Sequence, residues 1–311
     1  MFRILSETNF DFIGRRRTAY LVSVVFILAG LVHIAYQGGL LYGIDFSGGT
    51  LIQVRFEKDA RVDEIRDALA QVGLGESVIQ QFGDPREFLI RAPLSEEALE
   101  GVTERVQETL ARAVGELEVR RVESVGPQVG RDLQLRAVYA VLAGMAGILI
   151  YTAFRFELKG GIAAIIALVH DVLVSLVALS VTNRELSLPV LAALLTIVGY
   201  SINDTIVVYD RIRENRGKGI RKGQTLADVF NLSINQTLSR TVLTSLTAFL
   251  VVAVLYLFGG EVLKDFAFVL LVGVVTGTYS SIFVAAPIVV DWEAWFQNRA
   301  RAKKAVVKAK A

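Results

Sequence analysis

The sequence contains no cysteine and only two histidines, His33 and His170, among its 311 residues. The absence of cysteine excludes disulfides, thiol nucleophiles and cysteine-based zinc or iron–sulfur sites, and two histidines are too few for a multi-histidine metal cage. Charged residues are also scarce, at 21% against the roughly 25% of soluble domains. Apolar residues are abundant instead, since 53% of the chain is hydrophobic and the mean hydropathy is +0.50. The composition therefore indicates a membrane protein and points to no cofactor.

Six apolar stretches are long enough to cross a bilayer as helices, which takes about 20 residues. The predicted spans are Thr18–Tyr36, Leu135–Phe154, Gly161–Val181, Leu188–Val208, Val242–Phe258 and Phe266–Val290. The first follows three consecutive arginines, as the apolar core of a signal peptide also does. It is longer than such a core and no A-x-A-like cleavage site follows it, so we expect an uncleaved anchor.

Lysine and arginine in the short loops predict the orientation of the chain, because these residues concentrate on the cytoplasmic side. With a cytoplasmic N-terminus, the short loops on the opposite side carry one cation each, Arg184 and Lys264. The N-terminal segment, the turn at 155–159, the loop that ends at Arg240 and the C-terminal tail hold several each. Both termini are therefore predicted to be cytoplasmic.

These spans predict four parts of the chain. They are the cytoplasmic N-terminus with the first helix (1–37), an exported domain (38–134), five further spans with a cytoplasmic loop at 209–241 (135–290) and a basic cytoplasmic tail (291–311). The exported segment has more acidic than basic residues, which argues against nucleic acid as its partner. The basic cytoplasmic loop is expected to contact anionic lipid head groups.

The residue pattern of the exported segment predicts a series of strands and helices. Thr50–Phe56 alternates polar and apolar residues as a half-buried strand does. The elements that follow are a helix at Val62–Val72, strands at Ser77–Phe82 and Glu87–Arg91 around a turn at 83–85, a helix from Ser95 to Val114 and a strand at Glu118–Ser124. This order is the ferredoxin-like split βαβ arrangement. The predicted fold class is thus an α-helical membrane bundle of six transmembrane helices with an α+β ferredoxin-like exported domain.

Several polar residues lie inside the predicted spans, where an ionisable group costs several kcal/mol. Asp171 is near the middle of the third span and directly follows His170, and Asp204 is about two-thirds of the way along the fourth. On a helix, Thr196, Tyr200, Asn203 and Asp204 fall within an arc of roughly 100°. One face of roughly 80° in the fifth span and the residues just before it contains Gln236, Arg240, Thr244 and Thr247. The fourth and fifth spans therefore each present one polar face.

The functional interpretation of these faces is a proton-responsive seam. Carboxylates buried in a helix bundle can bind and release protons near neutral pH, and a crossing proton delivers roughly 2.3 kcal/mol per 100 mV. Arg240 could pair with Asp204 when that carboxylate is charged and release it when it is neutral. The predicted proton pathway is Asp204, Arg240 and Asp171. Its supporting polar face is Tyr200, Asn203, Thr196, Thr244 and Thr247.

Each of these residues also has a purely structural interpretation. Asp204 and Arg240 could form a static buried pair, Asp171 could be satisfied by His170, and Arg240 could extend to the cytoplasmic surface. The spacing Gly273-x-x-x-Gly277 fits a helix-dimerisation face, but we favour close packing within the bundle.

The sequence gives little support to an enzymatic function. An intramembrane aspartyl protease would pair a Tyr-Asp with a Gly-x-Gly-Asp, whereas Tyr209-Asp210 lies at the cytoplasmic boundary and no Gly-x-Gly precedes Asp204. The glycines at 217, 219 and 223 have no following GK[ST] and no preceding strand, so they form no phosphate-binding loop. We therefore expect a protein that is not an enzyme.

Four segments resemble the SecD/SecF family of Sec translocon accessory subunits. Gly43–Thr50 (GIDFSGGT) and Ser124–Gly130 (SVGPQVG) are similar to the motifs that flank the family's exported domain. Val198–Asn215 (VGYSINDTIVVYDRIREN) is the most specific match and, with Ser239–Leu246 (SRTVLTSL), resembles the fourth and fifth spans of the SecF members. The layout of one span, an exported domain and five further spans is also that of SecF members, so the resemblance covers nearly the whole chain.

The resemblance implies one half of a resistance-nodulation-division unit in the bacterial inner (plasma) membrane, with SecD as the other half. It implies proton-motive-force-assisted translocation of preproteins on the periplasmic side, after the SecYEG channel and the SecA ATPase have begun export. The family's proton-pathway aspartate falls on Asp204 and its fifth-span arginine on Arg240. Independently, a bundle with a single polar face needs a second face to pair with. The expected partners are SecD, SecYEG, SecA, the preprotein and membrane lipids, without nucleic acid and without a cofactor.

Two other functions remain open on the sequence. One is a non-transporting scaffold that stabilises the Sec translocon and uses its polar seam only for helix packing. The other is a small-molecule or lipid exporter of the same superfamily, which the single small exported domain and the Val198–Asn215 segment disfavour.

Overall fold

The structure, a computed structural model, describes residues 8–92, 101–219, 223–296 and 299. These residues form two compact units. A helical unit contains residues 8–40, 141–184 and those from 189 onward, and a smaller unit contains residues 41–140 together with 185–188. The first predicted turn of the helix expected at Ser95 and most of the basic tail lie outside the described residues.

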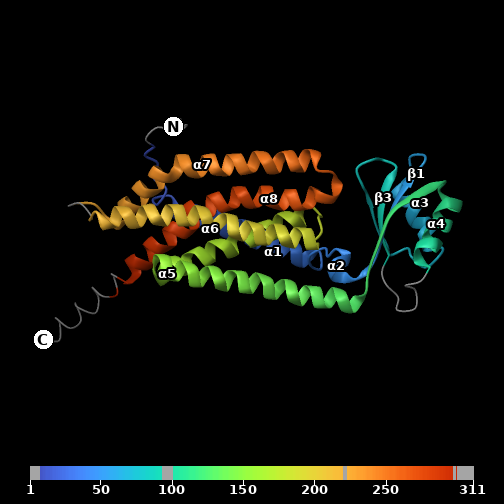
Figure 1. The fold of residues 1–311 in the computed structure, drawn as a ribbon, viewed down its shortest axis with the longest axis horizontal. Helices are drawn as coiled ribbons and strands as arrows, with labels where there is room; N and C mark the ends of the chain where they lie inside the picture. The colour runs from blue at the N-terminus through green and yellow to red at the C-terminus, as the bar shows by residue number, and fades with distance from the viewer. Residues whose placement is uncertain (1–7, 93–100, 220–222, 297–298, 300–311) are drawn as a thin grey trace. The chain divides into compact units, whose positions relative to one another are not determined.

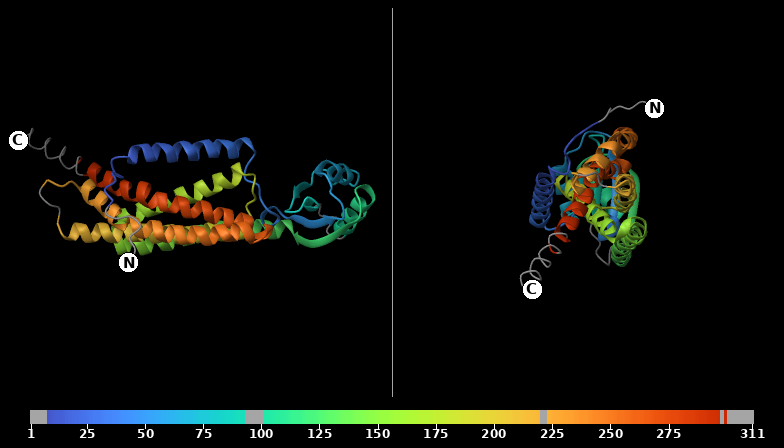
Figure 2. Two further views of the ribbon diagram at one scale, coloured as in Figure 1. Left: turned by 90° about the horizontal axis from the view of Figure 1, so that it is seen from above. Right: turned by 90° about the vertical axis from the view of Figure 1, so that its left-hand side faces the viewer.

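Within the described part of the chain, five helices are long and apolar enough to cross a membrane. They are α1 (Arg16–Tyr36), α5 (Pro127–Val181), α6 (Leu188–Gly217), α7 (Leu226–Phe258) and α8 (Glu261–Ser280). The last continues through a π-helical segment, η1 (Ser281–Ala285), to Phe296. Helices α6, α7 and α8 run alongside one another in both views (Figures 1 and 2). The prediction of a helical protein with several membrane spans is confirmed.

Helix α5 contains two predicted spans on either side of a break at Glu157. This residue has φ 73° and ψ 154°, a conformation that essentially only glycine adopts without strain. A Cβ atom on Gly161 would lie 3.1 Å from Oγ1 of Thr152, although nine residues of straight helix extend about 13 Å. The chain therefore bends back at Glu157, and α5 consists of two arms, 127–156 and 158–181.

Helix α7 begins well before the predicted fifth span, at a capping box. The Thr225 hydroxyl accepts a hydrogen bond from the Asp228 N–H at 3.3 Å, and the Asp228 carboxylate accepts one from the Thr225 N–H at 2.7 Å. Reciprocal contacts of this kind satisfy N–H groups that have no partner within the helix. The residues before Val242 thus form one continuous helix with the span.

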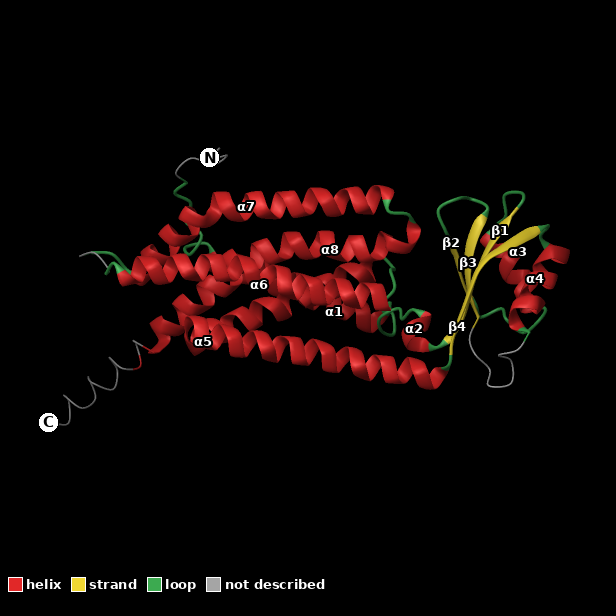
Figure 3. Cartoon of the chain, in the orientation of Figure 1, coloured by secondary structure: helices red, strands yellow, loops and turns green. Residues whose placement is uncertain are grey.

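The smaller unit is a four-stranded antiparallel sheet with two helices packed against it (Figure 3). Its elements are α2 (Ile44–Ser47), β1 (Gly49–Phe56), α3 (Val62–Ala70), β2 (Val78–Gln81), β3 (Glu87–Ala92), α4 (Val102–Ala113) and β4 (Leu117–Val125). The strand order is β2-β3-β1-β4, and Ile52 of β1 faces Ile90 of β3 and Val122 of β4. All four predicted strands are found within one or two residues of their expected bounds.

Alternating burial along β1 and β3 explains how this sheet holds its helices. Every second residue points inward, so Ile52, Val54 and Ile90 are fully buried against Ile65 of α3 and Leu110 of α4. Buried side chains of this size contribute about 1.5–3 kcal/mol each. The alternation predicted from Thr50–Phe56 therefore becomes the core of the sheet.

The predicted turn between β2 and β3 is held by one carboxylate. Asp84 accepts hydrogen bonds from the side chain and the backbone N–H of Arg86 and pairs with Arg55 at 3.2 Å. These hydrogen bonds, with the nearby positive charges, lower the pKa of Asp84 to about 2. The turn therefore keeps its ion pairs at any pH above this value.

Two glycines of α8 let it pack closely on α6. A Cβ atom on Gly273 would lie 2.2 Å from the Ile197 side chain, and one on Gly277 would lie 3.0 Å from Cβ of Ser201. The approach at Gly273 leaves no room for a side-chain carbon, and the approach at Gly277 is tighter than most side-chain contacts, so both positions favour glycine. The glycine pair contributes to packing within the chain, as favoured from the sequence.

We therefore expect Gly273→Ala to destabilise the helical unit by about 1–3 kcal/mol, the cost of overpacking a close helix contact. Gly147→Ala is a matched control, because no atom lies within 4 Å of its added Cβ and alanine favours the helix by about 1 kcal/mol. Thermal unfolding of both variants in detergent measures the difference. Equal melting temperatures for the two variants would contradict the packing assignment.

Candidate functional site

Asp204 lies on α6 in the interior of the helical unit and is 2% exposed. Its carboxylate accepts one hydrogen bond, from the Ser245 hydroxyl of α7 at 3.3 Å. Ser245 in turn shares a 2.6 Å hydrogen bond with the Thr278 hydroxyl of α8. Three helices therefore meet at Asp204, and the carboxylate has capacity for several more hydrogen bonds.

Two further polar groups near Asp204 are incompletely satisfied. The Tyr200 hydroxyl lies beside Ser245 and Asp204, but it completes no hydrogen bond of ordinary geometry with another described residue. The buried Thr241 hydroxyl, one turn before Ser245 on α7, also lacks a partner among the described residues. Unpaired buried polar groups typically cost 1–3 kcal/mol each. The hydroxyls of Tyr200 and Thr241 are therefore available for further hydrogen bonds.

Arg240 is the positive group that interacts electrostatically with Asp204. It lies on α7, five residues before Ser245, and its side chain is exposed in the chain by itself. Among the described residues no ion pair within 4.0 Å joins it to Asp204 or to another carboxylate. The predicted partners are therefore close enough to influence each other, but they are not in contact.

The rest of the predicted polar face divides into two kinds of residue. The hydroxyls of Thr196, Thr244 and Thr247 donate to carbonyl oxygens three or four residues earlier on their own helices. They therefore need no outside partner. Asn203 is exposed, and its side chain makes no hydrogen bond to any other residue that the structure describes. Asn203 and Arg240 are both exposed, and neither side chain has a hydrogen bond or ion pair to another described residue.

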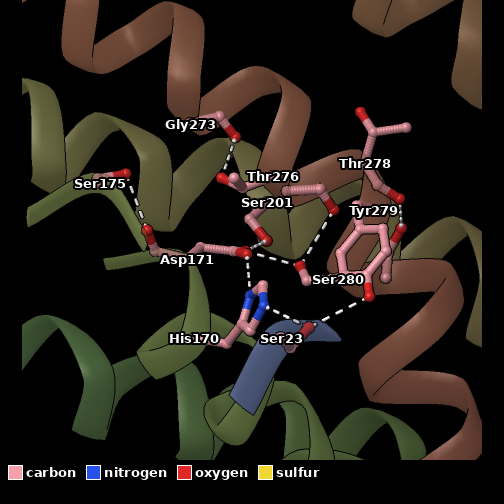
Figure 4. A network of polar contacts seen from close by, with 12 residues as sticks. Ser23, His170, Asp171, Ser175, Ser201, Gly273, Thr276, Thr278, Tyr279 and Ser280 are labelled. Carbon is pink, nitrogen blue, oxygen red and sulfur yellow. Dashed lines mark hydrogen bonds and ion pairs between the residues drawn. The ribbon is translucent and has the colours of Figure 1, made fainter. Parts of the chain in front are cut away.

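Asp171 occupies a different environment, the polar network of Figure 4. Its carboxylate is fully buried and accepts hydrogen bonds from the Ser201 hydroxyl at 2.6 Å and the Ser280 hydroxyl at 2.7 Å. The other carboxylate oxygen lies 3.0 Å from Nδ1 of His170. Three partners from α5, α6 and α8 thus hold this carboxylate.

The same network extends to α1 through His170. Nε2 of His170 lies 3.1 Å from the Ser23 hydroxyl, which is 3.1 Å from the Tyr279 hydroxyl. Tyr279 then donates to the carbonyl oxygen of Ala19 at 2.9 Å. Figure 4 shows the imidazole between Asp171 and Ser23. The sequence identified Asp171 and His170 but missed the other members, because isolated serines are ordinary in membrane helices.

The two aspartates therefore differ in how well they are satisfied. Asp171 has three partners within 3.0 Å, whereas Asp204 has one at 3.3 Å. Their surroundings are linked through α6, where Ser201 and Asp204 are one turn apart, and through α8, where Thr278 and Ser280 contact the two sites. A π-helical segment begins directly after Ser280, and such segments often occur at functional sites.

The described residues contain no group of three or more His, Asp or Glu side chains that could hold a metal ion. Asp171, His170 and Ser23 lie in the order carboxylate, imidazole and hydroxyl, and all three side chains are buried. Groups of these kinds donate and accept hydrogen bonds, and carboxylate and imidazole groups can carry or release a proton.

Comparison with known proteins gives a consistent result. Residues 105–295 match the family described as protein export membrane protein SecD/SecF, C-terminal, and residues 39–60 match the SecD/SecF GG motif. The protein translocase subunit SecF of Desulfurispirillum indicum is 48% identical over 290 residues, covering 90% of this chain and 91% of the relative. The subunit of the same name from Magnetococcus marinus is 49% identical, covering 92% of each chain.

Solved structures of SecDF are similar over most of this chain. The crystal structure of SecDF from Thermus thermophilus, a translocon-associated membrane protein, has 42% identity and a TM-score of 0.83 over 94% of this chain. A SecDF structure in a super-membrane-facing form has a TM-score of 0.69 over the full chain. This chain spans 40% and 41% of the length of those two chains.

The difference between the two aspartates predicts a difference in stability. Asp171→Asn places an amide NH₂ among hydrogen-bond donors, so we expect it to lower the free energy of unfolding by about 1–3 kcal/mol. Asp204→Asn disturbs one long hydrogen bond, so its effect is expected to stay below about 1 kcal/mol. Melting temperatures of both variants in the same detergent measure this. An equal or reversed ranking would show that the networks are assigned wrongly.

Proposed function

Because this chain belongs to the SecF family of protein translocase subunits, we propose that it uses the proton motive force to assist preprotein translocation, with Asp204 as the group that exchanges the proton. The observation that carries the proposal is the state of Asp204. It is 2% exposed and has one long hydrogen bond. A carboxylate in this state is stabilised either by taking up a proton or by gaining a cationic partner.

Arg240 is the cationic partner that stabilises the charged state of Asp204. A charged Asp204 attracts Arg240 on the neighbouring helix, and a protonated Asp204 releases it. Each proton that crosses delivers roughly 2.3 kcal/mol per 100 mV, enough to shift a two-state equilibrium of α6 and α7 by about fifty-fold. Proton flow and helix position are thereby coupled.

Asp171 takes a different part in this proposal. Its three hydrogen bonds favour a fixed carboxylate that holds α5, α6 and α8 together. It belongs to the pathway as a fixed neighbour, since Ser201, which it holds, is one turn from Asp204. Tyr200 and Asn203 supply the polar surroundings of the exchanging group.

SecD is the proposed partner of the exposed polar face. Asn203 and Arg240 are exposed in this chain, and such side chains are costly against lipid tails. The solved SecDF chains are more than twice as long as this one, so a SecD part is available there to cover such a face. The SecYEG channel, SecA, the preprotein and membrane lipids are the further partners we propose, without nucleic acid and without a cofactor.

The break at Glu157 supports six membrane crossings from five long helices. A helix of 55 residues would extend about 82 Å, more than twice the hydrocarbon thickness, whereas each arm is of spanning length. We propose six crossings in the bacterial inner membrane with both termini cytoplasmic. The strand order and the alternation of strands and helices support a ferredoxin-like exported domain.

Single cysteines test this topology cleanly, because the chain has none of its own. Cysteines at the exposed positions Leu158 and Lys218 are expected to react with a membrane-impermeant maleimide in inverted vesicles, and a cysteine at Thr182 only in spheroplasts. Labelling of all three positions from the same side would contradict the hairpin at Glu157.

Asp204→Asn tests the function directly, because asparagine keeps the shape of aspartate but does not titrate. In inverted vesicles that contain SecD, export is expected to fall to the level measured without a proton gradient, with SecD co-purification unchanged. Asp210→Asn is the matched control on the same helix, since Asp210 pairs with Arg155 at 2.6 Å away from the seam. Normal gradient-dependent export by Asp204→Asn would contradict the proton-exchange role and favour the non-transporting scaffold.

A further inference from the structure

The segment that precedes β1 is joined to the loop that precedes α6. The Gly43 N–H donates to the Leu186 carbonyl oxygen at 2.9 Å, and the Leu186 N–H donates to the Leu41 carbonyl oxygen at 2.7 Å. Tyr42 and Leu186 thereby form a parallel β-bridge. Residues 185–188 therefore belong to the same compact unit as the exported sheet, although they lie between two membrane helices in the sequence.

Asp45 adds a side-chain contact to this joint. Its Oδ2 atom accepts a hydrogen bond at 2.8 Å from the backbone N–H of Leu188, the first residue of α6. The first N–H groups of a helix have no partner within it, and a carboxylate placed there satisfies a donor and complements the helix dipole. A residue 143 positions earlier in the chain thus caps α6.

Other contacts fix Asp45 on the side of the exported domain. The Gln134 side chain donates to the Phe46 carbonyl oxygen at 2.8 Å. A Cβ atom on Gly130 would lie 2.9 Å from the same oxygen, so the first arm of α5 packs closely on α2. Arg91 of β3 forms an ion pair with Glu185. Both the sheet and its leading segment therefore hold the start of α6.

We infer that Asp45 couples α6 to the exported domain, so that movement of α6 driven at Asp204 is passed through Leu188 to the segment that precedes β1. Asp204 lies 16 residues after Leu188 on one continuous helix, which is about 24 Å of stiff rod. Without the cap, the first turn of α6 frays and the 185–188 loop absorbs the movement. This inference rests on the proposed proton-driven function and assigns Asp45 as a positioning residue within it.

Replacement of Asp45 tests the coupling. Asp45→Ala is expected to remove the gradient-dependent part of export, leaving gradient-independent export and SecD co-purification unchanged. Asp45→Asn is the matched conservative variant and is expected to keep most of the gradient-dependent part, because asparagine also caps helices well. Hydrogen–deuterium exchange of residues 188–192 is expected to be faster in Asp45→Ala. Unchanged exchange or unchanged export in that variant would overturn the inference.

A disulfide lock separates coupling from a general folding defect. A Cβ atom on Gly43 would lie 3.3 Å from Cβ of Ser187, close to the distance that disulfides span, and Gly43 has φ −67°, which cysteine adopts freely. Under oxidising conditions, Gly43→Cys with Ser187→Cys is expected to restore gradient-dependent export to Asp45→Ala, and dithiothreitol to abolish it again. The same lock with Asp45 intact is expected to export normally.

The outcomes distinguish this inference from the proposed function. Loss of export in Asp204→Asn, combined with failure of the oxidised lock to rescue Asp45→Ala, would overturn the coupling role alone. A lock that blocks export with Asp45 intact would overturn it as well, because the joint would then have to open. Normal export by Asp204→Asn in the same vesicles would overturn the proton-driven function beneath it.

Discussion

Removing a carboxylate from water costs free energy, and the arrangement of the helical unit depends on how that cost is offset. An ionised group in an apolar bundle must gain hydrogen bonds, gain a counter-charge or take up a proton. Asp171 meets this demand with three hydrogen bonds from neighbouring helices, and the partners it needs fix α5, α6 and α8 in place. Asp204 meets it incompletely, with one hydrogen bond and an electrostatic interaction with Arg240 that is not a contact ion pair. The two carboxylates therefore differ in how completely the described residues satisfy them.

Helix α6 connects the features that matter for function. It carries Ser201, which donates to Asp171, and Asp204, which accepts from Ser245, one turn apart. Its contact with α8 is close because Gly273 and Gly277 carry no side chains, which allows Ser201 to lie near Ser280. Its first residue is capped by Asp45. This single helix therefore makes hydrogen bonds at both aspartates and at Asp45.

Much of the fold follows from periodicity along the chain. Apolar runs of about 20 residues predicted the membrane helices, and alternation at Thr50–Phe56 predicted β1 within a residue. Helix ends were predicted less well, since α6 and α7 continue beyond the apolar runs through polar turns. Apolar residues indicate which part of a helix lies in lipid, whereas hydrogen bonding of the backbone at the helix ends determines where the helix stops.

The sequence by itself determined that Asp171 and Asp204 are costly in a membrane, because both lie within apolar runs long enough to span one. It also determined the order of strands and helices in the smaller unit, since side-chain periodicity is local. Only the tertiary structure decided which carboxylate is satisfied, because the serines and tyrosine around Asp171 come from three different helices, α1, α6 and α8. It alone placed Asp45 at the start of α6, since contacts between residues 143 positions apart leave no periodic trace in the chain.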